Sequence, residues 1–253
     1  MRNELLLNEF FKQNPRFAVA FSGGVDSSYL LCAADAAGCD VHAYFIKSEF
    51  QPQFELEEAI SFAKSLDVPL TVETMSILNE HDVICNSSGR CFHCKSRILE
   101  RLRMLMLEDG FTVLCDGTNA DDDESDRPGM KALKEQGVIS PLRDCGLGKK
   151  EIRLLSKKAG LLTFDKPAYA CLATRIPIGT VITKDLLERV ERAEGSLFDM
   201  GFSDFRVRLM PPDTAMVQMH KDQWEKAAKQ RIEIVKALES DFVSILLDME
   251  ARG

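Results

Sequence analysis

The segment FSGGVDSS, residues 21–28, places two glycines, three serines and an aspartate at one junction. An apolar, β-prone run precedes it and a helix-forming run follows it. Glycines let backbone amides approach an anion, serines add hydroxyl donors, and a helix start adds its positive end. The junction therefore predicts a phosphate site, where Asp26 fits if a Mg²⁺ lies between carboxylate and phosphate. A capped helix after a tight turn is the plainer alternative.

The loop has neither the lysine of a Walker A motif nor the GxGxxG spacing of a dinucleotide fold. SGGVDS instead matches the SGGxDS signature of the ATP pyrophosphatase (PP-loop) superfamily. This resemblance implies that ATP is cleaved between its α- and β-phosphates, that the substrate is adenylated, and that the loop holds pyrophosphate. The residues it implies for ATP and pyrophosphate are Ser22, Gly23, Gly24, Asp26 and Ser27, with Ser22 and Asp26 also catalytic.

A second polar segment, CDGTN at residues 115–119, follows another apolar run. It resembles the adenine-pocket segment of PP-loop enzymes, which implies nucleotide contacts for Gly117 and Asn119. An acidic stretch follows, in which Asp123 and Asp126 are candidate Mg²⁺ ligands. Arg127 could turn back to grip phosphate. A solvated acidic loop is the alternative for this stretch.

Two further residues are predicted to contact the nucleotide. Ser48 comes directly after the second predicted strand, where such folds often touch adenine. Lys149, in GKKEIR, resembles basic residues that PP-loop enzymes place near the triphosphate. A plain surface charge is the alternative for Lys149.

Eight cysteines are present, and Cys91 and Cys94 form a CxxC motif in RCFHCK. From the residues alone, this motif suits a zinc half-site, a redox pair or a cluster ligand pair. In the zinc case Cys85 is a candidate further ligand. Cys171 lies in KPAYACLATR, and its plainer interpretation is an inert core cysteine.

Several segments, in this order, together resemble the LarE family: RCFHCK, DGTNADD, SPLRDCGLGKKEIRLLSKKAGL and KPAYACLATRIPIGT. The resemblance runs from about Arg16 to Arg208. It implies an ATP-dependent sulfur transferase of nickel-pincer cofactor synthesis for lactate racemase. Such an enzyme adenylates a carboxylate of pyridinium-3,5-biscarboxylic acid mononucleotide and converts it into a thiocarboxylate.

The family has two branches that differ in the source of sulfur. One branch sacrifices the sulfur of a single cysteine and leaves dehydroalanine. The other has three cysteines that bind a [4Fe-4S] cluster carrying an extra sulfide. This chain has all three, so it resembles the cluster branch, with Cys91, Cys94 and Cys171 as ligands and Cys171 also catalytic. Zinc, or no cluster, is the alternative.

A phosphorylated, dicarboxylic substrate requires cations. Arg206 and Arg208 alternate on a predicted strand, so they share a face, and their FRVR segment is similar to the family's. The further substrate-binding candidates are Arg175, Thr174 and Glu194. Surface ion pairs of little energetic value are the alternative for Arg206 and Arg208. A plain position on a helix surface is the alternative for Glu194.

The chain alternates β-prone and helical runs, which predicts an α/β fold with a parallel sheet over residues 1–165. The resemblance makes this a PP-loop ATP pyrophosphatase domain, similar to adenine nucleotide alpha hydrolases. Residues 166–253 are predicted to form a smaller α+β domain for substrate binding and oligomerisation. Its expected elements are helices at Lys184–Met200 and Lys221–Leu238 and strands at Phe205–Met210, Ala215–Met219 and Phe242–Leu247.

Composition excludes some function classes. The net charge of −8 over 253 residues disfavours broad nucleic-acid binding. No apolar run is long enough for a bilayer and no signal peptide is evident, so we expect a cytoplasmic protein without membrane contact. We also expect a homo-oligomer, and a sulfur-donor protein is left open as a partner.

The alternatives to a sulfur transferase are another adenylating PP-loop ligase and a sensor. The ligase would be similar to GMP or NAD synthetase or to a tRNA-thiolating enzyme. The sensor would be a non-catalytic protein that binds an adenine nucleotide and zinc.

Overall fold

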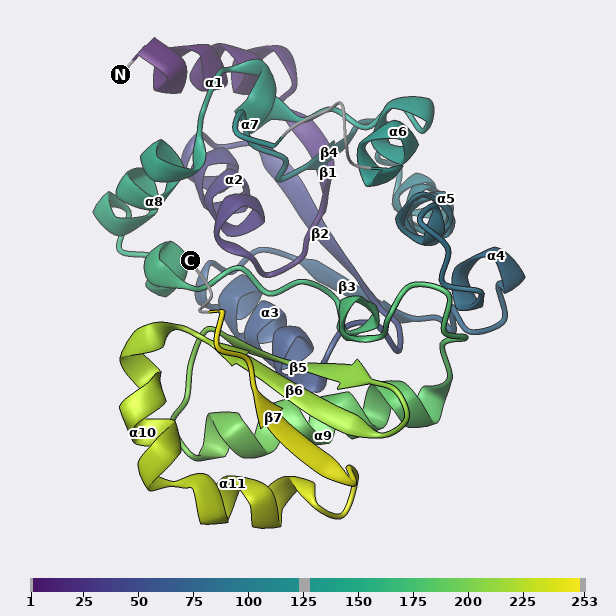
Figure 1. The fold of residues 1–253 in the computed structure, drawn as a ribbon. Coiled ribbons are helices and arrows are strands. Elements are labelled where there is room, and N and C mark those ends of the chain that lie inside the picture. Colours follow the sequence, from purple (N-terminus) through teal and green to yellow (C-terminus); the bar gives the residue numbers. More distant parts are fainter. Residues whose placement is uncertain (1, 123–127, 251–253) are drawn as a thin grey trace. The chain divides into compact units, whose positions relative to one another are not determined.

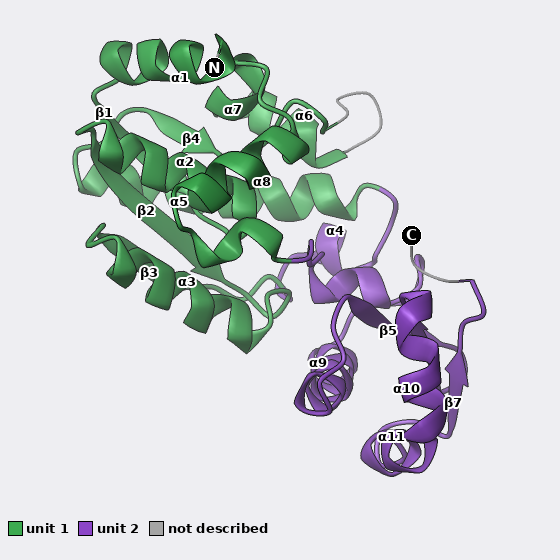
Figure 2. Ribbon diagram, turned by 90° about the vertical axis from the view of Figure 1, so that its left-hand side faces the viewer, with its two compact units in different colours: residues 1–77, 89–166 green, residues 78–88, 167–253 purple. Residues whose placement is uncertain are grey.

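The computed structural model describes residues 2–122 and 128–250. They form two compact units, one of residues 1–77 and 89–166 and the other of residues 78–88 and 167–253 (Figure 2). The chain passes from one unit to the other three times. The predicted Mg²⁺ ligands Asp123 and Asp126 and the predicted phosphate contact Arg127 lie outside the described residues.

The first unit contains a four-stranded parallel sheet in the order β3-β2-β1-β4, which confirms the predicted α/β class (Figure 1). Its strands are β1 (Arg16–Ala20), β2 (Asp40–Lys47), β3 (Leu70–Thr74) and β4 (Leu114–Asp116). Its helices are α1 (Arg2–Gln13), α2 (Val25–Ala36), α3 (Gln53–Ser65), α5 (Arg90–Glu108), α6 (Pro128–Glu135), α7 (Pro141–Asp144) and α8 (Lys149–Lys158).

Helices cover both faces of this sheet, because successive side chains of each strand point to opposite sides. On β1, Phe17 and Val19 join a core formed with α1, α2, α3 and α8. Ala18 joins the opposite core, formed with α5 and α6. All three side chains are completely buried, as expected for a parallel strand between two helical layers.

The strand order places the two predicted nucleotide segments side by side. β1 and β4 are parallel neighbours, with Ala20 paired to Asp116. Their carboxyl ends therefore lie at the same edge of the sheet, where α/β proteins bind ligands. The SGGVDS loop follows β1, and the CDGTN segment includes the end of β4.

The second unit has a three-stranded sheet in the order β5-β6-β7, formed by β5 (Phe205–Met210), β6 (Thr214–Met219) and β7 (Ser244–Leu247). β5 pairs with β6 antiparallel and β6 with β7 parallel. Helices α9 (Lys184–Asp199), α10 (Trp224–Lys229) and α11 (Arg231–Leu238) supply most of its helical part. Phe205, Val207 and Leu197 are fully or almost fully buried in its core.

The prediction of one helix over Lys221–Leu238 is wrong. The segment consists of the 3₁₀ turn η3 (Lys221–Gln223), α10 and α11. Gln230, at φ −98° and ψ 18°, leaves α-helical geometry between the two helices. The chain bends there (Figure 1), and Ala227 before the bend and Ile234 after it reach the same core.

Leu78–Ser88 belongs to the second unit, which the sequence did not indicate. It contains the short helix α4 (His81–Ile84). Asn86, completely buried, donates from its side-chain amide to the carbonyls of Ile176 at 3.3 Å and Pro177 at 2.8 Å. The Asn86 carbonyl accepts from the amide of Gly179 at 3.0 Å. This asparagine therefore fixes the inserted segment within the second unit.

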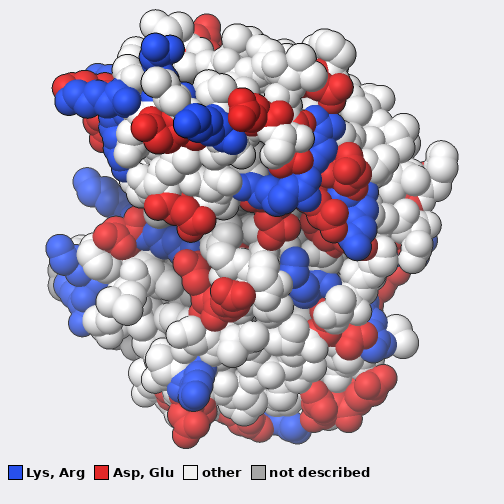
Figure 3. Space-filling view, turned by 90° about the horizontal axis from the view of Figure 1, so that it is seen from below, with Lys and Arg blue, Asp and Glu red and all other residues white. Residues whose placement is uncertain are grey.

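Acidic and basic side chains are interspersed on the face shown in Figure 3. The part of the chain that the structure describes has no helix with both the length and the apolar character needed to cross a bilayer.

Replacing Asn86 tests the inserted segment. Asn86 has a left-handed backbone, with φ +52°. Asn86→Gly removes the side-chain hydrogen bonds and should destabilise the protein by about 1–3 kcal/mol. Asn86→Ala removes the same bonds and adds strain at positive φ, so it should cost about 1 kcal/mol more. Chemical denaturation measures both, and equal stability of the alanine variant and the wild type would contradict this role.

Candidate active site

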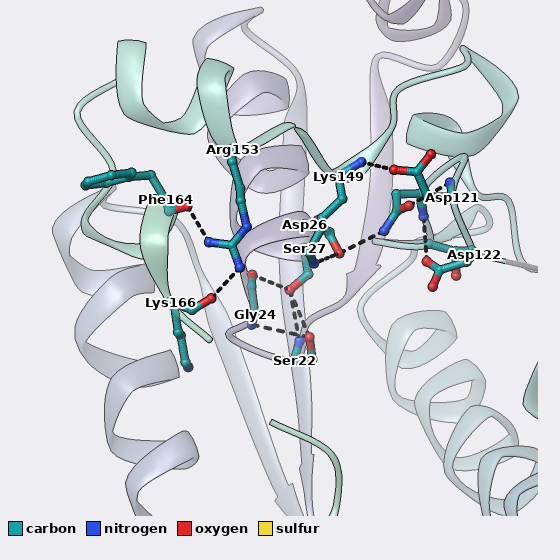
Figure 4. Close-up of polar contacts among 12 residues, drawn as sticks. Ser22, Gly24, Asp26, Ser27, Asp121, Asp122, Lys149, Arg153, Phe164 and Lys166 are labelled. Atoms are coloured by element: carbon teal, nitrogen blue, oxygen red, sulfur yellow. Dashed lines mark hydrogen bonds and ion pairs between the residues drawn. The ribbon is translucent and has the colours of Figure 1, made fainter. Parts of the chain in front are cut away.

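The SGGVDS loop is closed by its own serine hydroxyls. The Ser22 and Ser27 hydroxyl oxygens lie 3.0 Å apart, and the Ser27 hydroxyl accepts from the Ser22 amide at 3.3 Å and donates to the Gly24 carbonyl at 3.3 Å (Figure 4). Gly23 has φ +68°, which favours glycine. α2 begins directly after Gly24. Hydroxyls and a helix N-terminus therefore gather in this one loop.

Gly117 touches the loop from the β4 side. A Cβ added there would lie 2.6 Å from the backbone nitrogen of Ser27 and 2.8 Å from its Cα. Only a glycine allows this approach of two backbones. The predicted nucleotide contacts of Gly117 and of the loop thus belong to one site.

Asp26 is the charged centre of this site. Lys149, the first residue of α8, donates to Asp26 Oδ2 at 2.6 Å, and the Asn119 amide donates to the same oxygen at 3.2 Å. The other carboxylate oxygen, Oδ1, is buried and has no hydrogen-bond partner among the described residues. A buried carboxylate oxygen of this kind is a suitable ligand for a hard cation. The residues present therefore fit Mg²⁺ at Asp26.

Acidic side chains order the loop after β4. Asp121 accepts from the backbone amide of Lys149 at 2.7 Å, and Asp122 accepts from the amide of Asn119 at 3.0 Å (Figure 4). Asp116, buried at the end of β4, accepts from the Ser140 hydroxyl at 2.7 Å. These carboxylates fix the segments that carry Asn119 and Lys149.

Ser48 is buried in the turn after β2. Its hydroxyl donates to the Gln51 side chain at 2.7 Å and accepts from the Phe50 amide at 3.2 Å. These bonds stabilise the turn, and a contact between Ser48 and adenine stays a prediction.

Lys166 is a residue of this site that the sequence did not indicate. Its ammonium group lies 3.0 Å from the Gly23 carbonyl and 2.5 Å from a carboxylate oxygen of Glu58. It is the first residue of the KPAYACLATR segment, and its contact with a loop about 140 residues earlier in the chain could not be predicted from that segment.

The CxxC cysteines open α5. Cys91 is exposed and Cys94 is half-buried, and their spacing places both on one side of the first helical turns. The Arg90 guanidinium lies 3.7 Å from Cys91 Sγ. Soft thiolates suit both zinc and iron–sulfur clusters, so this pair fits either metal centre.

Four other cysteines are poor candidates for this chemistry. Burial raises the pKa of Cys32, Cys39, Cys115 and Cys145, and nearby carboxylates raise it further for all of them except Cys39. A raised pKa leaves less of the reactive thiolate at neutral pH. Cys145 follows α7 and is buried in the core of the first unit.

In the second unit, Arg175 and Glu194 form a buried ion pair at 2.9 Å, with 2% and 1% of each residue exposed. Arg175 also donates to the Ala170 carbonyl at 2.9 Å and the Thr174 hydroxyl at 2.7 Å. Glu194 therefore does not lie on a helix surface. The pair anchors the segment containing Cys171, which is half-buried and precedes the 3₁₀ turn η2 (Leu172–Arg175).

Arg206 and Arg208 lie on one face of β5 and hold the same segment through its carbonyls. Arg206 donates to the Ala168 carbonyl, and Arg208 donates to the Thr174 carbonyl at 2.8 Å. Only 4% of Arg206 is exposed, so it is not part of a surface ion pair.

Tyr169 also lies in KPAYACLATR, but no role was predicted for it. Its hydroxyl donates to Glu194, and its ring faces the guanidinium groups of Arg175 at 4.6 Å and Arg206 at 5.0 Å. Both distances are within the range of cation–π contacts.

The three predicted cluster ligands are divided between the units: Cys91 and Cys94 belong to the first and Cys171 to the second. Within the described residues of each unit, no three His, Cys, Asp or Glu side chains gather to hold one metal ion. A shared three-cysteine site therefore stays a prediction, as does zinc with Cys85.

A parallel α/β sheet with an SGGVDS loop between β1 and α2 defines a PP-loop protein. No family model matches the chain. It is 33% identical over 199 residues to the pyridinium-3,5-bisthiocarboxylic acid mononucleotide synthase of Lactiplantibacillus plantarum, covering 78% of this chain and 72% of that one. The chain therefore belongs to the LarE family, as its motifs predict.

Two other relatives match over a greater length. An uncharacterized protein of Synechocystis sp. is 33% identical over 248 residues, covering 96% of this chain and 92% of that one. An uncharacterized protein of Methanocaldococcus jannaschii is 30% identical over 248 residues, covering 96% and 93%. Similarity to these two extends over both units.

A glycine pair tests the close approach at the loop. Gly117→Ala would place a methyl group against the backbone of Ser27, so α2 or β4 must shift, and we expect a loss of about 1–3 kcal/mol in stability. Gly24→Ala is the control, because its φ of −78° suits any residue and the nearest atom to a new Cβ is Ser22 Oγ at 3.4 Å. Thermal unfolding that ranks the two variants equally would contradict the close approach.

Proposed function

We propose that this protein is an ATP-dependent sulfur transferase that adenylates a carboxylate of pyridinium-3,5-biscarboxylic acid mononucleotide and converts it into a thiocarboxylate. The name of the Lactiplantibacillus relative, a pyridinium-3,5-bisthiocarboxylic acid mononucleotide synthase, supports the product class. The observation that carries the adenylation step is the Asp26 carboxylate beside the SGGVDS loop, with one oxygen bound by Lys149 and Asn119 and the other buried without a hydrogen-bond partner among the described residues.

Adenylation requires the loop to hold the leaving group. A substrate carboxylate oxygen attacks the α-phosphorus of ATP, the bond to the bridging oxygen of the β-phosphate breaks, and pyrophosphate departs. The amides of Gly23 and Gly24 and the hydroxyls of Ser22 and Ser27 are the donors for this anion, next to the positive end of α2. Asp26 would hold Mg²⁺, which neutralises charge on the phosphates.

Sulfur transfer then replaces AMP on the activated carbonyl. A sulfur nucleophile attacks the carbonyl carbon, and the carbon–oxygen bond to AMP breaks. We assign Cys91, Cys94 and Cys171 as the residues that would hold a [4Fe-4S] cluster, which supplies sulfide when bound.

The arginines of the second unit suit an anionic pyridinium mononucleotide. Arg208 is partly exposed and donates to the neutral Thr174 carbonyl, and a phosphate or carboxylate is a stronger acceptor than a carbonyl. Arg206 is buried against the Ala168 carbonyl, so its contact with the substrate would require that segment to move. Arg175 and Glu194 neutralise each other, so their contribution is to position Thr174 and the segment around it. We retain a homo-oligomer and a sulfur-donor protein as expected partners.

Asp26→Asn tests the adenylation step. It keeps the shape of the side chain but removes the charge that would hold Mg²⁺, so substrate-dependent pyrophosphate release should fall by about 100-fold or more. Asp35→Asn, in the exposed last turn of the same helix, is the control and should leave the rate unchanged. Pyrophosphate release at the wild-type rate in Asp26→Asn would refute the proposal.

Cysteine variants test the source of sulfur. Replacing Cys91, Cys94 or Cys171 singly with Ala should lower iron bound after anaerobic reconstitution and stop thiocarboxylate formation, while adenylation persists. Cys145→Ala is the control, because that thiol is buried in the core of the first unit. Intact mass after turnover distinguishes the branches: dehydroalanine at Cys171 would make it the sacrificial donor. Zinc in place of iron would support the zinc alternative.

A further inference from the structure

Two lysines approach the SGGVDS loop, and each is paired with a carboxylate. Lys149 is held by Asp26 at 2.6 Å. Lys166 is held by Glu58 of α3 at 2.5 Å, while its ammonium group also donates to the Gly23 carbonyl at 3.0 Å. Lys149 thus lies against Asp26 beside the loop that the proposed function assigns to pyrophosphate (Figure 4), and Lys166 contacts a carbonyl of that loop.

The backbone on either side of Lys166 is fixed from α8. The Arg153 guanidinium donates to the Phe164 carbonyl at 2.7 Å and to the Lys166 carbonyl at 2.8 Å. Pro167 follows and restricts the conformation of Lys166 further. The main chain on both sides of Lys166 is thus held in place, its ammonium group contacts the loop, and only 17% of its side chain is exposed.

The loop and α3 are in close contact, which explains why Glu58 can reach Lys166. A Cβ on Gly23 would lie 3.4 Å from the Cβ of Ala59, the residue after Glu58. Glu58 itself is 53% exposed. Water screens an ion pair with a half-exposed partner, so Glu58 is a weak competitor for the lysine.

We propose that Lys166 is a pyrophosphate-binding residue, and that Glu58 holds its ammonium group until a polyphosphate replaces the carboxylate. A lysine ammonium has three donors, of which the described contacts with Gly23 and Glu58 use two. A phosphate oxygen placed against the loop amides offers a more highly charged acceptor than one carboxylate. This assignment rests on the proposed function, because it takes the loop as the pyrophosphate site.

Opposite effects of two variants separate this role from a structural salt bridge. With inorganic pyrophosphate and Mg²⁺ as the probe in calorimetric titration, Lys166→Gln should weaken binding about tenfold, the loss of one charge-assisted contact. Glu58→Gln should strengthen binding about two- to threefold, because it removes the competitor. In the double variant the gain from Glu58→Gln should vanish, because it acts through Lys166.

Glu57→Gln and Lys64→Gln, on the same helix, are matched controls and should bind as the wild type does. If Lys166→Gln does not unfold cooperatively, Lys166→Arg is used in its place. Because arginine keeps the positive charge, this variant should weaken pyrophosphate binding less than the roughly tenfold expected for loss of the charge. Equal weakening by Lys166→Gln and Glu58→Gln, or wild-type affinity in Lys166→Gln, would overturn the assignment. A wild-type protein that does not bind pyrophosphate would refute the proposed function itself, a result distinct from either.

Discussion

The Asp26 carboxylate joins three segments of the first unit. It lies at the start of α2, it accepts from Lys149 at the start of α8, and it accepts from Asn119 after β4. Parallel pairing of β1 with β4 brings the first and third segments to one edge of the sheet. The backbone contact of Gly117 with Ser27 then sets their separation. The Asp26 hydrogen bonds and the close approach of Gly117 to Ser27 thus occur at the same site. The position of the Asp26 carboxylate is therefore set by the pairing of β1 with β4.

The second unit depends on a buried ion pair instead. Arg175 and Glu194 are almost completely excluded from water, and removing either partner of such a pair typically costs about 3–5 kcal/mol. Glu194 also accepts from Tyr169 and from the Val207 amide on β5, so one carboxylate connects α9, β5 and the Cys171 segment. The position of Cys171 is therefore set by electrostatics buried in the core of its own unit.

Local pattern was enough to predict the parallel sheet, the SGGVDS loop and the sharing of one β5 face by Arg206 and Arg208. Contacts between segments that are distant in the sequence could not be predicted from local patterns. The insertion of Leu78–Ser88 into the second unit depends on the Asn86 amide and carbonyls some ninety residues later. The bend at Gln230 is imposed by a core that both flanking helices must reach. Lys166 and Tyr169 lie in the KPAYACLATR segment, but no role was predicted for either, and only tertiary contacts reveal their partners.

The ion pairs differ in how far water reaches them. Arg175 and Glu194, with side chains 1% and 2% exposed, have no access to an anion from solvent and remain paired. Lys166 is paired with a carboxylate that is 53% exposed, and Lys149 is itself 35% exposed. Because screening weakens exposed pairs, Glu58 is the carboxylate that a multiply charged phosphate would displace under the proposed function, whereas Asp26, with 17% of its side chain exposed, remains beside Lys149. An acidic protein can in this way keep a cation beside the SGGVDS loop and still release it to a polyanion.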